Sequence, residues 1–507
     1  MGNLILAHDL GTSGNKATLY NFNGELVASN THTYDTLTPA NGFVEQDPQE
    51  WWRAVCESTK KMIQDALIRP SQIDCVTFSG QMMGCIPVDK DGNHLYHALI
   101  WADTRYNNEM YKIEKNISLE ETYRITGHRL SASYSAAKFK WIQDNRPDIY
   151  KKTFKMLNAK DYVIGRMTGV YGTDYSDASG TNLLDIREKT WSDRMLDAFQ
   201  IDKNKLPEIY KSTDIVGKLN SRAAAETGLL EGTPVVMGGG DGSCAAVGAG
   251  VVSEGNVYNV LGSSSWISCA KSTPVFDESM RTFNWIALNE NLFTPCGTMQ
   301  SAGYSFKWAS ENLFKQEKEL IKKTDKSFNL YLNELVETTL PGANNLLFLP
   351  YLLGERSPRW NLNARGAFVG LGASHTNTQM LRSVMEGVGF NLKLILEALE
   401  NGTHTEEVIL IGGGAKSITW LQILADIWQK KIVVPKYLEE ATSMGAAICA
   451  GVGLGEFSDF SVISRFNPKE RVIEPNSENK EIYDKLYRIF NEAYDSLEAI
   501  YNKLNLT

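Results

Sequence analysis

The chain lacks the patterns typical of disulfide-stapled, zinc-binding or membrane-spanning proteins. Its seven cysteines are scattered over 507 residues without a Cys-x-x-Cys pair, so neither a disulfide framework nor a thiolate zinc site is indicated. No apolar run reaches the length of a membrane span. The first run ends at Asp9, and the small-residue runs at 245–252 and 444–452 are also short. We interpret these two runs as buried helix segments, expect no membrane partner, and place the protein in the cytoplasm.

The chain also has fewer positively charged residues than negatively charged ones. The 51 Lys and Arg residues against 60 Asp and Glu residues give a formal net charge of −9. This balance disfavours broad binding to nucleic acid, so we expect no nucleic-acid partner. An anionic ligand remains allowed, because backbone N–H groups bind phosphate even in an acidic protein.

Strand-like and helix-like segments alternate along the chain, which predicts an α/β protein with sheets covered by helices. The runs at 74–78 and 408–411 are strand-like, whereas 48–66 and 379–399 have helical patterns. In the first helix, Trp51, Val55, Met62 and Ala66 share a face that we expect to be core.

The length indicates at least two domains, because it exceeds what one compact core accommodates. We predict domains at 1–250 and 251–507, with the boundary in the stretch Gly250 to Gly255. A charge-rich segment from Glu311 to Leu335 is expected to form a solvated helix with a variable loop. Residues 480–504 are expected to close the second domain as a C-terminal helix. Its predicted core-facing stripe consists of Ile482, Leu486, Ile489, Ala493, Leu497, Ile500 and Leu504.

Each half of the chain carries one short turn rich in glycine and hydroxyl residues. The first is Asp9-Leu-Gly-Thr-Ser-Gly14 and the second is Leu261-Gly-Ser-Ser-Ser265, and each links two β-prone stretches. The pattern predicts two hairpins whose N–H and hydroxyl groups can hold a nucleotide's phosphates between two domains. Two ordinary tight hairpins are the alternative. Because Val260 stands where the first hairpin has Asp9, magnesium-linked chemistry is assigned to the first half.

Two further motifs follow apolar runs, at predicted strand ends where clefts open in α/β proteins. They are Ser79-Gly-Gln-Met-Met-Gly84 and Ile100-Trp-Ala-Asp-Thr-Arg105. Trp101 offers a flat apolar face, and Gln81, Asp103 and Arg105 offer hydrogen bonds, which is the mixture that a sugar needs. The alternative is that Trp101 belongs to the core and that Asp103 and Arg105 form a structural ion pair.

Two glycine-rich turns complete the set of motifs. The segment 235–243 ends a strand-like run in three glycines followed by Asp241. A carboxylate there can take the proton from an attacking hydroxyl, although helix capping is an equally common use of Asp. The turn at Gly412, Gly413 and Gly414 suits an adenine or phosphate contact, or a tight structural connection.

Longer motifs resemble those of a known family. The segment Ser133 to Asn145 is similar to the first signature of the FGGY carbohydrate kinases, which belong to the actin-like and hexokinase-like ATPase superfamily. Residues 366–371, followed by 379–386, are similar to the second signature. The resemblance runs from Asp9 to about Gly451. The motifs at 79–82 and 101–105 are most similar to those of the family's xylulokinases.

The resemblance implies two actin-like (ribonuclease H-like) ATPase domains around a central cleft. It also implies ATP-dependent phosphorylation of a sugar or polyol hydroxyl, with Mg²⁺, and a homodimer is among the assemblies that it allows. By motif, Asp241 is the general base and Asp9 orients the metal. The substrate pocket is formed by Gln81, Met82, Trp101, Asp103 and Asp241. The ATP contacts are Thr12, Ser13, Gly262, Ser263, Gly412, Gly413 and Gly414.

Two departures affect the substrate rather than the reaction. Met83 stands where xylulokinases usually have His, and Gly242 where they usually have Asn. Both changes remove polar side chains from the predicted sugar pocket, which alters preference. A pentulose such as xylulose is therefore the first expectation, with gluconate or another ketose or polyol as alternatives. An ATPase switch of the same superfamily and a non-catalytic sugar sensor are further alternatives, which the retained Asp9 and Asp241 and the sugar motifs disfavour.

Overall fold

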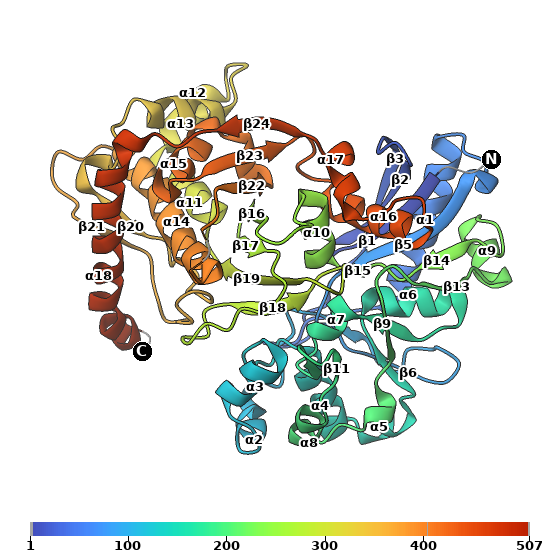
Figure 1. The fold of residues 1–507 in the computed structure, drawn as a ribbon. Helices are drawn as coiled ribbons and strands as arrows, with labels where there is room; N and C mark the ends of the chain where they lie inside the picture. Colours follow the sequence, from blue (N-terminus) through green and yellow to red (C-terminus); the bar gives the residue numbers. More distant parts are fainter. Residues whose placement is uncertain (1–3, 403, 505–507) are drawn as a thin grey trace.

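Two mixed sheets, one from each half of the chain, organise the molecule (Figure 1). The computed structural model describes residues 4–402 and 404–504. The first sheet has the order β13-β14-β5-β1-β2-β3, with β15 also paired to β5. Its strands are β1 (Leu4–Leu10), β2 (Gly14–Asn21), β3 (Leu26–Thr33), β5 (Ile73–Gly80), β13 (Ile215–Lys218), β14 (Pro234–Val236) and β15 (Gly239–Gly240).

The second sheet has the order β18-β19-β17-β16-β22-β23-β24. Its strands are β16 (Val257–Leu261), β17 (Ser265–Cys269), β18 (Phe283–Ile286), β19 (Phe293–Met299), β22 (Glu407–Ile411), β23 (Lys431–Pro435) and β24 (Lys469–Ile473). The pairs β1–β2 and β16–β17 are antiparallel, which confirms both predicted hairpins.

Six strands of each sheet repeat one topology. The order β3-β2-β1-β5-β14-β13 corresponds to β19-β17-β16-β22-β23-β24, with the same parallel and antiparallel pairings at every step. Because the topology repeats, the turn after β1 and the turn after β16 occupy equivalent places. This duplication agrees with the predicted pair of actin-like domains.

Helices cover the first sheet on both faces. On one face α1 (Pro48–Asp65) buries Trp51, Val55 and Met62 against β-strand residues, which confirms the core face predicted for this helix, while Ala66 lies just past its end. On the other face α16 (Ala441–Gly453) packs through Met444 and Ala447, although it comes from the far end of the chain (Figure 1). Also on the first face are α6 (Ala159–Thr168) and α9 (Ser221–Thr227).

The helix α10 (Asp241–Ala249) crosses α16 and packs on the second sheet through Ala246 and Ala249. The crossing requires glycine. A Cβ at Gly248 would lie 1.8 Å from the carbonyl oxygen of Ala441, and a Cβ at Gly445 would lie 1.9 Å from that of Cys244. Both small-residue runs are thus buried helix segments, as the sequence predicts, and each half of the chain lends a helix to the other half's sheet.

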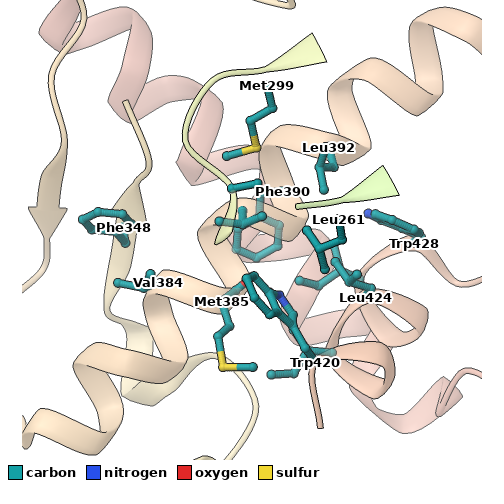
Figure 2. Packing of buried hydrophobic residues seen from close by; sticks show 14 of the residues in the cluster. Leu261, Met299, Phe348, Val384, Met385, Phe390, Leu392, Trp420, Leu424 and Trp428 are labelled. Carbon is teal, nitrogen blue, oxygen red and sulfur yellow. The ribbon is translucent and has the colours of Figure 1, made fainter. Parts of the chain in front are cut away.

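The core of the second half lies on the opposite face of the second sheet (Figure 2). There α14 (Asn377–Glu400) and α15 (Ile418–Trp428) bury Phe390, Leu424 and Trp428 beside Leu261 and Met299. The second signature adds polar contacts in this core, since Arg382 pairs with Glu386 at 2.7 Å and both bond to the hydroxyl of Tyr483 in α18 (Lys480–Leu504).

Two expectations for the second half are wrong in part. The segment from Glu311 to Leu335 is not one helix: it spans three helices, because the chain breaks at Phe314 and again between 321 and 328. In α18 the buried face is aromatic, and Ile489, Ile500 and Leu504 of the predicted stripe are 37%, 46% and 61% exposed. Leu486 of the predicted stripe is buried, and the other buried side chains of this helix are Tyr483, Phe490, Tyr494 and Tyr501.

The remaining elements are short. Those before residue 241 are β4 (Glu45–Gln46), β6 (Ile86–Val88), β7 (Ala98–Leu99), α2 (Tyr111–Glu114), α3 (Leu119–Thr126), α4 (Ser135–Asn145), α5 (Pro147–Lys152), β8 (Lys155–Leu157), β9 (Gly172–Asp174), α7 (Tyr175–Ser179), β10 (Leu184–Asp185), β11 (Thr190–Trp191), α8 (Asp193–Phe199) and β12 (Glu208–Tyr210). Those after it are α11 (Gly303–Leu313), α12 (Lys315–Ile321), α13 (Phe328–Glu337), β20 (Leu347–Leu349), β21 (Ala367–Val369) and α17 (Ile463–Phe466). Within the described ranges, no helix is both long and apolar enough to cross a bilayer.

Candidate active site

Three parallel strands of the first sheet bring the predicted catalytic carboxylates to one edge. β1, β5 and β15 run side by side, so that Asp9 pairs with Ser79 and Gly239 pairs with Ser79 from the other side. Asp241 follows β15 directly, as the first residue of α10. The carboxyl ends of parallel strands meet at one edge, which is where α/β proteins bind ligands.

The environment of Asp9 makes its carboxyl group a weaker acid than usual. Burial raises the pKa of Asp9 to about 6, although the hydroxyl of Ser79 donates to Oδ1 at 2.9 Å and Lys16 lies near. Oxygen donors of this kind, one or two carboxylates beside phosphates, are what Mg²⁺ prefers. Asp9 therefore fits the metal that the family resemblance implies.

Asp241 is the more strongly perturbed of the two carboxyl groups. Burial, together with the negative charge of Asp9, raises the pKa of Asp241 to about 7, while the backbone N–H of Gly242 donates to Oδ1 at 2.7 Å. The cap position of α10 is Gly240, so Asp241 is not the N-cap residue. A general base works best with a pKa near the operating pH, and Asp241 meets that condition.

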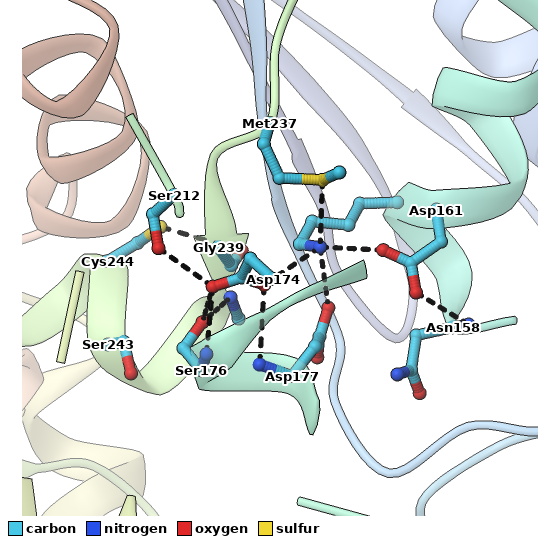
Figure 3. A network of polar contacts seen from close by, with 12 residues as sticks. Asn158, Asp161, Asp174, Ser176, Asp177, Ser212, Met237, Gly239, Ser243 and Cys244 are labelled. Carbon is cyan, nitrogen blue, oxygen red and sulfur yellow. Dashed lines mark hydrogen bonds and ion pairs between the residues drawn. The ribbon is translucent and has the colours of Figure 1, made fainter. Parts of the chain in front are cut away.

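A buried ionic network fixes the backbone just before Asp241 (Figure 3). The ammonium of Lys160 contacts three carboxylates at 2.7–3.1 Å, those of Asp161, Asp174 and Asp177. Asp174 accepts a hydrogen bond from the hydroxyl of Ser176 at 2.5 Å, and Ser176 in turn accepts one from the N–H of Gly240 at 2.9 Å. This chain of contacts ties the start of α10 to the interior of the first half, which positions Asp241 rigidly.

A cavity of about 270 Å³ opens beside Asp241 between the two halves of the chain. We call it the interlobe cavity. It is lined by Thr12, Met82, Met83, Trp101, Asp241, Gly242, Tyr258, Trp266, Ser268, Phe283, Trp285, Thr294, Cys296 and Thr298. Its size suits a small metabolite rather than a drug-sized ligand.

Four predicted site residues, Thr12, Met82, Trp101 and Asp241, line this cavity together with both positions that depart from the xylulokinase pattern, Met83 and Gly242. Trp101 is 36% exposed and donates from Nε1 to the hydroxyl of Thr12 at 2.9 Å, so it is not a core residue.

Asp103 and Gln81 are placed differently. Asp103 is fully buried and does not line the cavity, because Arg105 binds both of its carboxylate oxygens and Val44 donates to Oδ2 at 2.7 Å. The ion-pair alternative describes Asp103 correctly, so the geometry does not support its predicted direct contact with sugar. Gln81 donates to the side chain of Gln46 at 2.8 Å, behind the first turn, and its Oε1 has no partner among the described residues. A ligand contact for Gln81 stays a prediction.

The predicted nucleotide contacts of the second half lie together. β16 and β22 are parallel neighbours, so the turn at Gly262 and Ser263 ends beside Gly412. Gly412 has a φ of +88°, and a Cβ there would lie 3.0 Å from the carbonyl oxygen of Leu261. Space is open at Gly413, whereas a Cβ at Gly414 would lie 2.4 Å from the side chain of Leu261.

The first turn is held from behind rather than from the cavity. Ser13 is exposed, and its carbonyl oxygen accepts from the N–H of Tyr34 at 3.2 Å. Gln46 donates to the carbonyl oxygen of Thr12 at 2.6 Å. Both turns therefore present exposed hydroxyl residues, as a phosphate-binding role requires.

Sequence reasoning missed the wall that β17, β18 and β19 contribute. Alternate residues of these strands face the cavity, Trp266 with Ser268, Phe283 with Trp285, and Thr294 with Cys296 and Thr298. The period of two was available in the sequence. Which face would meet Asp241, some 25 to 57 residues earlier in the chain, was not.

A buried lysine of the first signature was missed as well. Lys138 of α4 donates to the carbonyl oxygens of Met83, at 3.0 Å, and of Ser133. Met83 has a φ of +61°, an unusual backbone conformation for a residue other than glycine. The signature lysine therefore fixes the part of the cavity wall where this chain departs from xylulokinases.

The duplicated topology and the cavity between the halves define a two-lobed ATPase fold of the actin-like type. Comparisons with known proteins agree. The model of the FGGY family of carbohydrate kinases, N-terminal domain, matches residues 4–248, and that of the C-terminal domain matches residues 257–454. The chain belongs to the FGGY family of carbohydrate kinases, and it is an ATP-dependent carbohydrate kinase. The predicted fold and enzyme class are confirmed.

Relatives with different substrates are similarly close. The chain is 33% identical to a xylulose kinase of Bacillus subtilis over 492 residues, which is 97% of this chain and 96% of the relative. It is 30% identical to a gluconokinase of Bacillus licheniformis over 506 residues, 99% of this chain and 98% of the relative. The structure of a ligand-bound xylulose kinase from Lactobacillus acidophilus superposes with a TM-score of 0.92 at 28% identity, covering 99% of this chain and 100% of that one.

Proposed function

We propose that the protein transfers the γ-phosphoryl group of ATP to a hydroxyl of a neutral ketose or polyol, a pentulose such as xylulose in the first place. The observation that carries the proposal is the interlobe cavity with Asp241 at its edge. Similarity to xylulose kinases over nearly the whole chain supports the pentulose.

In the proposed reaction Asp241 takes the proton of the substrate hydroxyl. The hydroxyl oxygen then bonds to the γ-phosphorus, and the bond from that phosphorus to the β–γ bridging oxygen breaks, which leaves ADP. Asp9 would hold Mg²⁺ and so orient the phosphates, and the ion, when bound, would neutralise charge that develops on them. The turns at Thr12–Ser13 and Gly262–Ser263 donate to phosphate oxygens, and Gly412–Gly414 borders the nucleotide.

Gluconate is the competing substrate, since gluconokinases are among the relatives. A carboxylate in a site that excludes water needs a cationic partner. Among the described residues that line the interlobe cavity there is no Lys, Arg or His, and Asp241 supplies a negative charge. The cavity therefore favours a neutral substrate over a sugar acid.

The proposal is tested by initial rates of ADP release with pentuloses, hexuloses, polyols and sugar acids. We expect measurable turnover with neutral ketoses or polyols and at least tenfold lower kcat/KM with gluconate. A preference for gluconate would contradict the assignment of a neutral substrate. Turnover with none of these compounds would contradict the proposed function itself.

We further propose that the domains are 1–250, which holds the sugar site and the catalytic residues, and 251–507, which holds the nucleotide site and the closing helix. The spans of the two family models support this division. The cytoplasmic location and the homodimer remain predictions.

A further inference from the structure

The walls of the interlobe cavity differ in chemistry. The first half of the chain supplies Asp241 and the hydroxyl of Thr12. The second half supplies a wall that is rich in aromatic rings and that none of the family motifs includes. This wall consists of Tyr258, Trp266, Ser268, Phe283, Trp285, Thr294, Cys296 and Thr298.

Most polar atoms of the aromatic residues are engaged by other protein groups. Trp266 donates from Nε1 to the hydroxyl of Tyr258 at 2.9 Å, and that hydroxyl donates to the carbonyl oxygen of Gly242 at 3.3 Å. Trp285 lies on β18, near the thiol of Cys296 on the paired strand β19. Trp266 and Tyr258 therefore offer a ligand their ring faces rather than hydrogen bonds.

Two hydroxyl groups of the wall are different. Ser268 Oγ and Thr298 Oγ1 are buried without a hydrogen-bond partner among the described residues. A buried hydroxyl without a partner is costly in a folded protein, so we expect a bound ligand or an ordered water to supply the missing bonds. The wall thus provides two hydroxyls for hydrogen bonding and an otherwise apolar surface.

We propose that this wall is an apolar subsite, and that the substrate is a neutral ketose or polyol that carries a methyl or methylene group, in place of a hydroxyl, at the end facing the wall. This inference rests on the proposed function. A hydroxyl at the end of the sugar that faces the wall would lie against rings that cannot bond to it, whereas a methyl group packs there. One such group in a hydrophobic pocket changes specificity by roughly 10- to 200-fold.

Matched pairs of sugars test the subsite. D-xylulose is compared with 1-deoxy-D-xylulose, and L-fructose with its 6-deoxy analogue L-rhamnulose, by kcat/KM for ADP release. We expect the deoxy member of at least one pair to be favoured at least tenfold. Equal values, or a preference for the hydroxylated member in both pairs, would overturn the subsite and leave the proposed function intact.

Binding is measured separately from turnover, so that the two proposals fail distinguishably. Trp101, Trp266 and Trp285 line the cavity, and their fluorescence should report each sugar without nucleotide. Tighter binding of the deoxy sugars without turnover would support the subsite and contradict the kinase reaction. If none of the four sugars shows either binding or turnover, the proposed subsite is overturned.

Two variants connect the preference to the wall. Cys296→Ser places a hydroxyl on the apolar surface, and we expect it to shift the kcat/KM ratio severalfold toward the hydroxylated sugar. Cys269→Ser is the matched control, because Cys269 is buried in the neighbouring strand but does not line the cavity. An identical ratio in both variants would count against the subsite.

Thr298→Val covers the case in which Cys296→Ser fails to fold. It removes an unpartnered hydroxyl, so the melting temperature should stay the same or rise while KM for the preferred sugar increases about tenfold. An unchanged KM in this well-folded variant would show that Thr298 does not contact the substrate and would overturn the role of the hydroxyl pair.

Discussion

Replacing Asp241 by Asn should abolish most activity and, above neutral pH, stabilise the protein. The carboxyl of Asp241 has a pKa of about 7 in the folded chain and the ordinary value of 3.8 when unfolded. Between these values the folded state binds more protons than the unfolded state, so the free energy of unfolding falls as pH rises. Above pH 7 the cost of the ionised carboxylate is fully present.

The size of the effect follows from the two pKa values. From pH 5 to pH 7 the wild-type carboxyl loses about 2.7 kcal/mol relative to a neutral side chain, at 1.36 kcal/mol per unit. Water in the cavity screens the charge, so we take about half, roughly 1.4 kcal/mol. The unfolding entropy is about 2.1 cal/mol/K per residue. The melting temperature of Asp241→Asn relative to wild type should therefore be about 1–3 °C higher at pH 8 than at pH 5.

Thermal scans at the two pH values measure this gain, and a coupled assay of ADP release measures turnover. We expect turnover to fall by roughly a hundredfold or more, the scale for loss of a general base. Asp65→Asn serves as the control, since Asp65 lies on the exposed end of α1 and should alter neither quantity. Near-normal turnover in a folded variant would refute the role of Asp241. If the difference in melting temperature between the variant and wild type is smaller at pH 8 than at pH 5, the electrostatic reasoning is refuted.

Three further predictions concern the metal, specificity and motion. Asp9→Ala should lower kcat by roughly a hundredfold, as loss of an electrostatic contact to the transferred group does, and should change sugar binding much less. Normal turnover with normal magnesium dependence would contradict the assignment of Asp9. Met83→His with Gly242→Asn should shift relative kcat/KM toward D-xylulose, and the space at Gly242, where a Cβ would meet only Met82 at 3.8 Å, allows the larger side chain. An unchanged ranking of sugars in active variants would show that these positions do not set specificity. Sugar plus a non-hydrolysable nucleotide should close the cleft and reduce the radius of gyration in X-ray scattering. Scattering that stays the same with both ligands would speak against closure.

The parts of the fold and site that depend on local pattern could be predicted from the sequence. The two hairpins are signalled by β-prone runs on either side of glycine turns. The meeting of Asp9 and Asp241 follows because each carboxylate lies at or just beyond the carboxyl end of a strand in the same sheet.

The parts that depend on distant partners could not be predicted. The ion pair of Asp103 with Arg105 was one of two interpretations of the sequence, but nothing in the sequence signals that Arg105 also bonds to Glu45 at 2.7 Å, sixty residues earlier. The aromatic face of α18 is not signalled by the aliphatic stripe, because its buried side chains are mostly Tyr and Phe. The Tyr483 hydroxyl is satisfied inside the core by Glu386, from a helix almost a hundred residues earlier.

One experiment tests whether the protein phosphorylates a neutral sugar or polyol with Asp241 as the base. The most direct test is ³¹P NMR of the wild-type protein and Asp241→Asn with ATP, Mg²⁺ and D-xylulose or its 1-deoxy analogue. We expect a sugar-phosphate signal that grows with ADP for the wild type and is almost absent for the variant. ADP and inorganic phosphate without a sugar phosphate, or equal sugar-phosphate signals from both proteins, would contradict it.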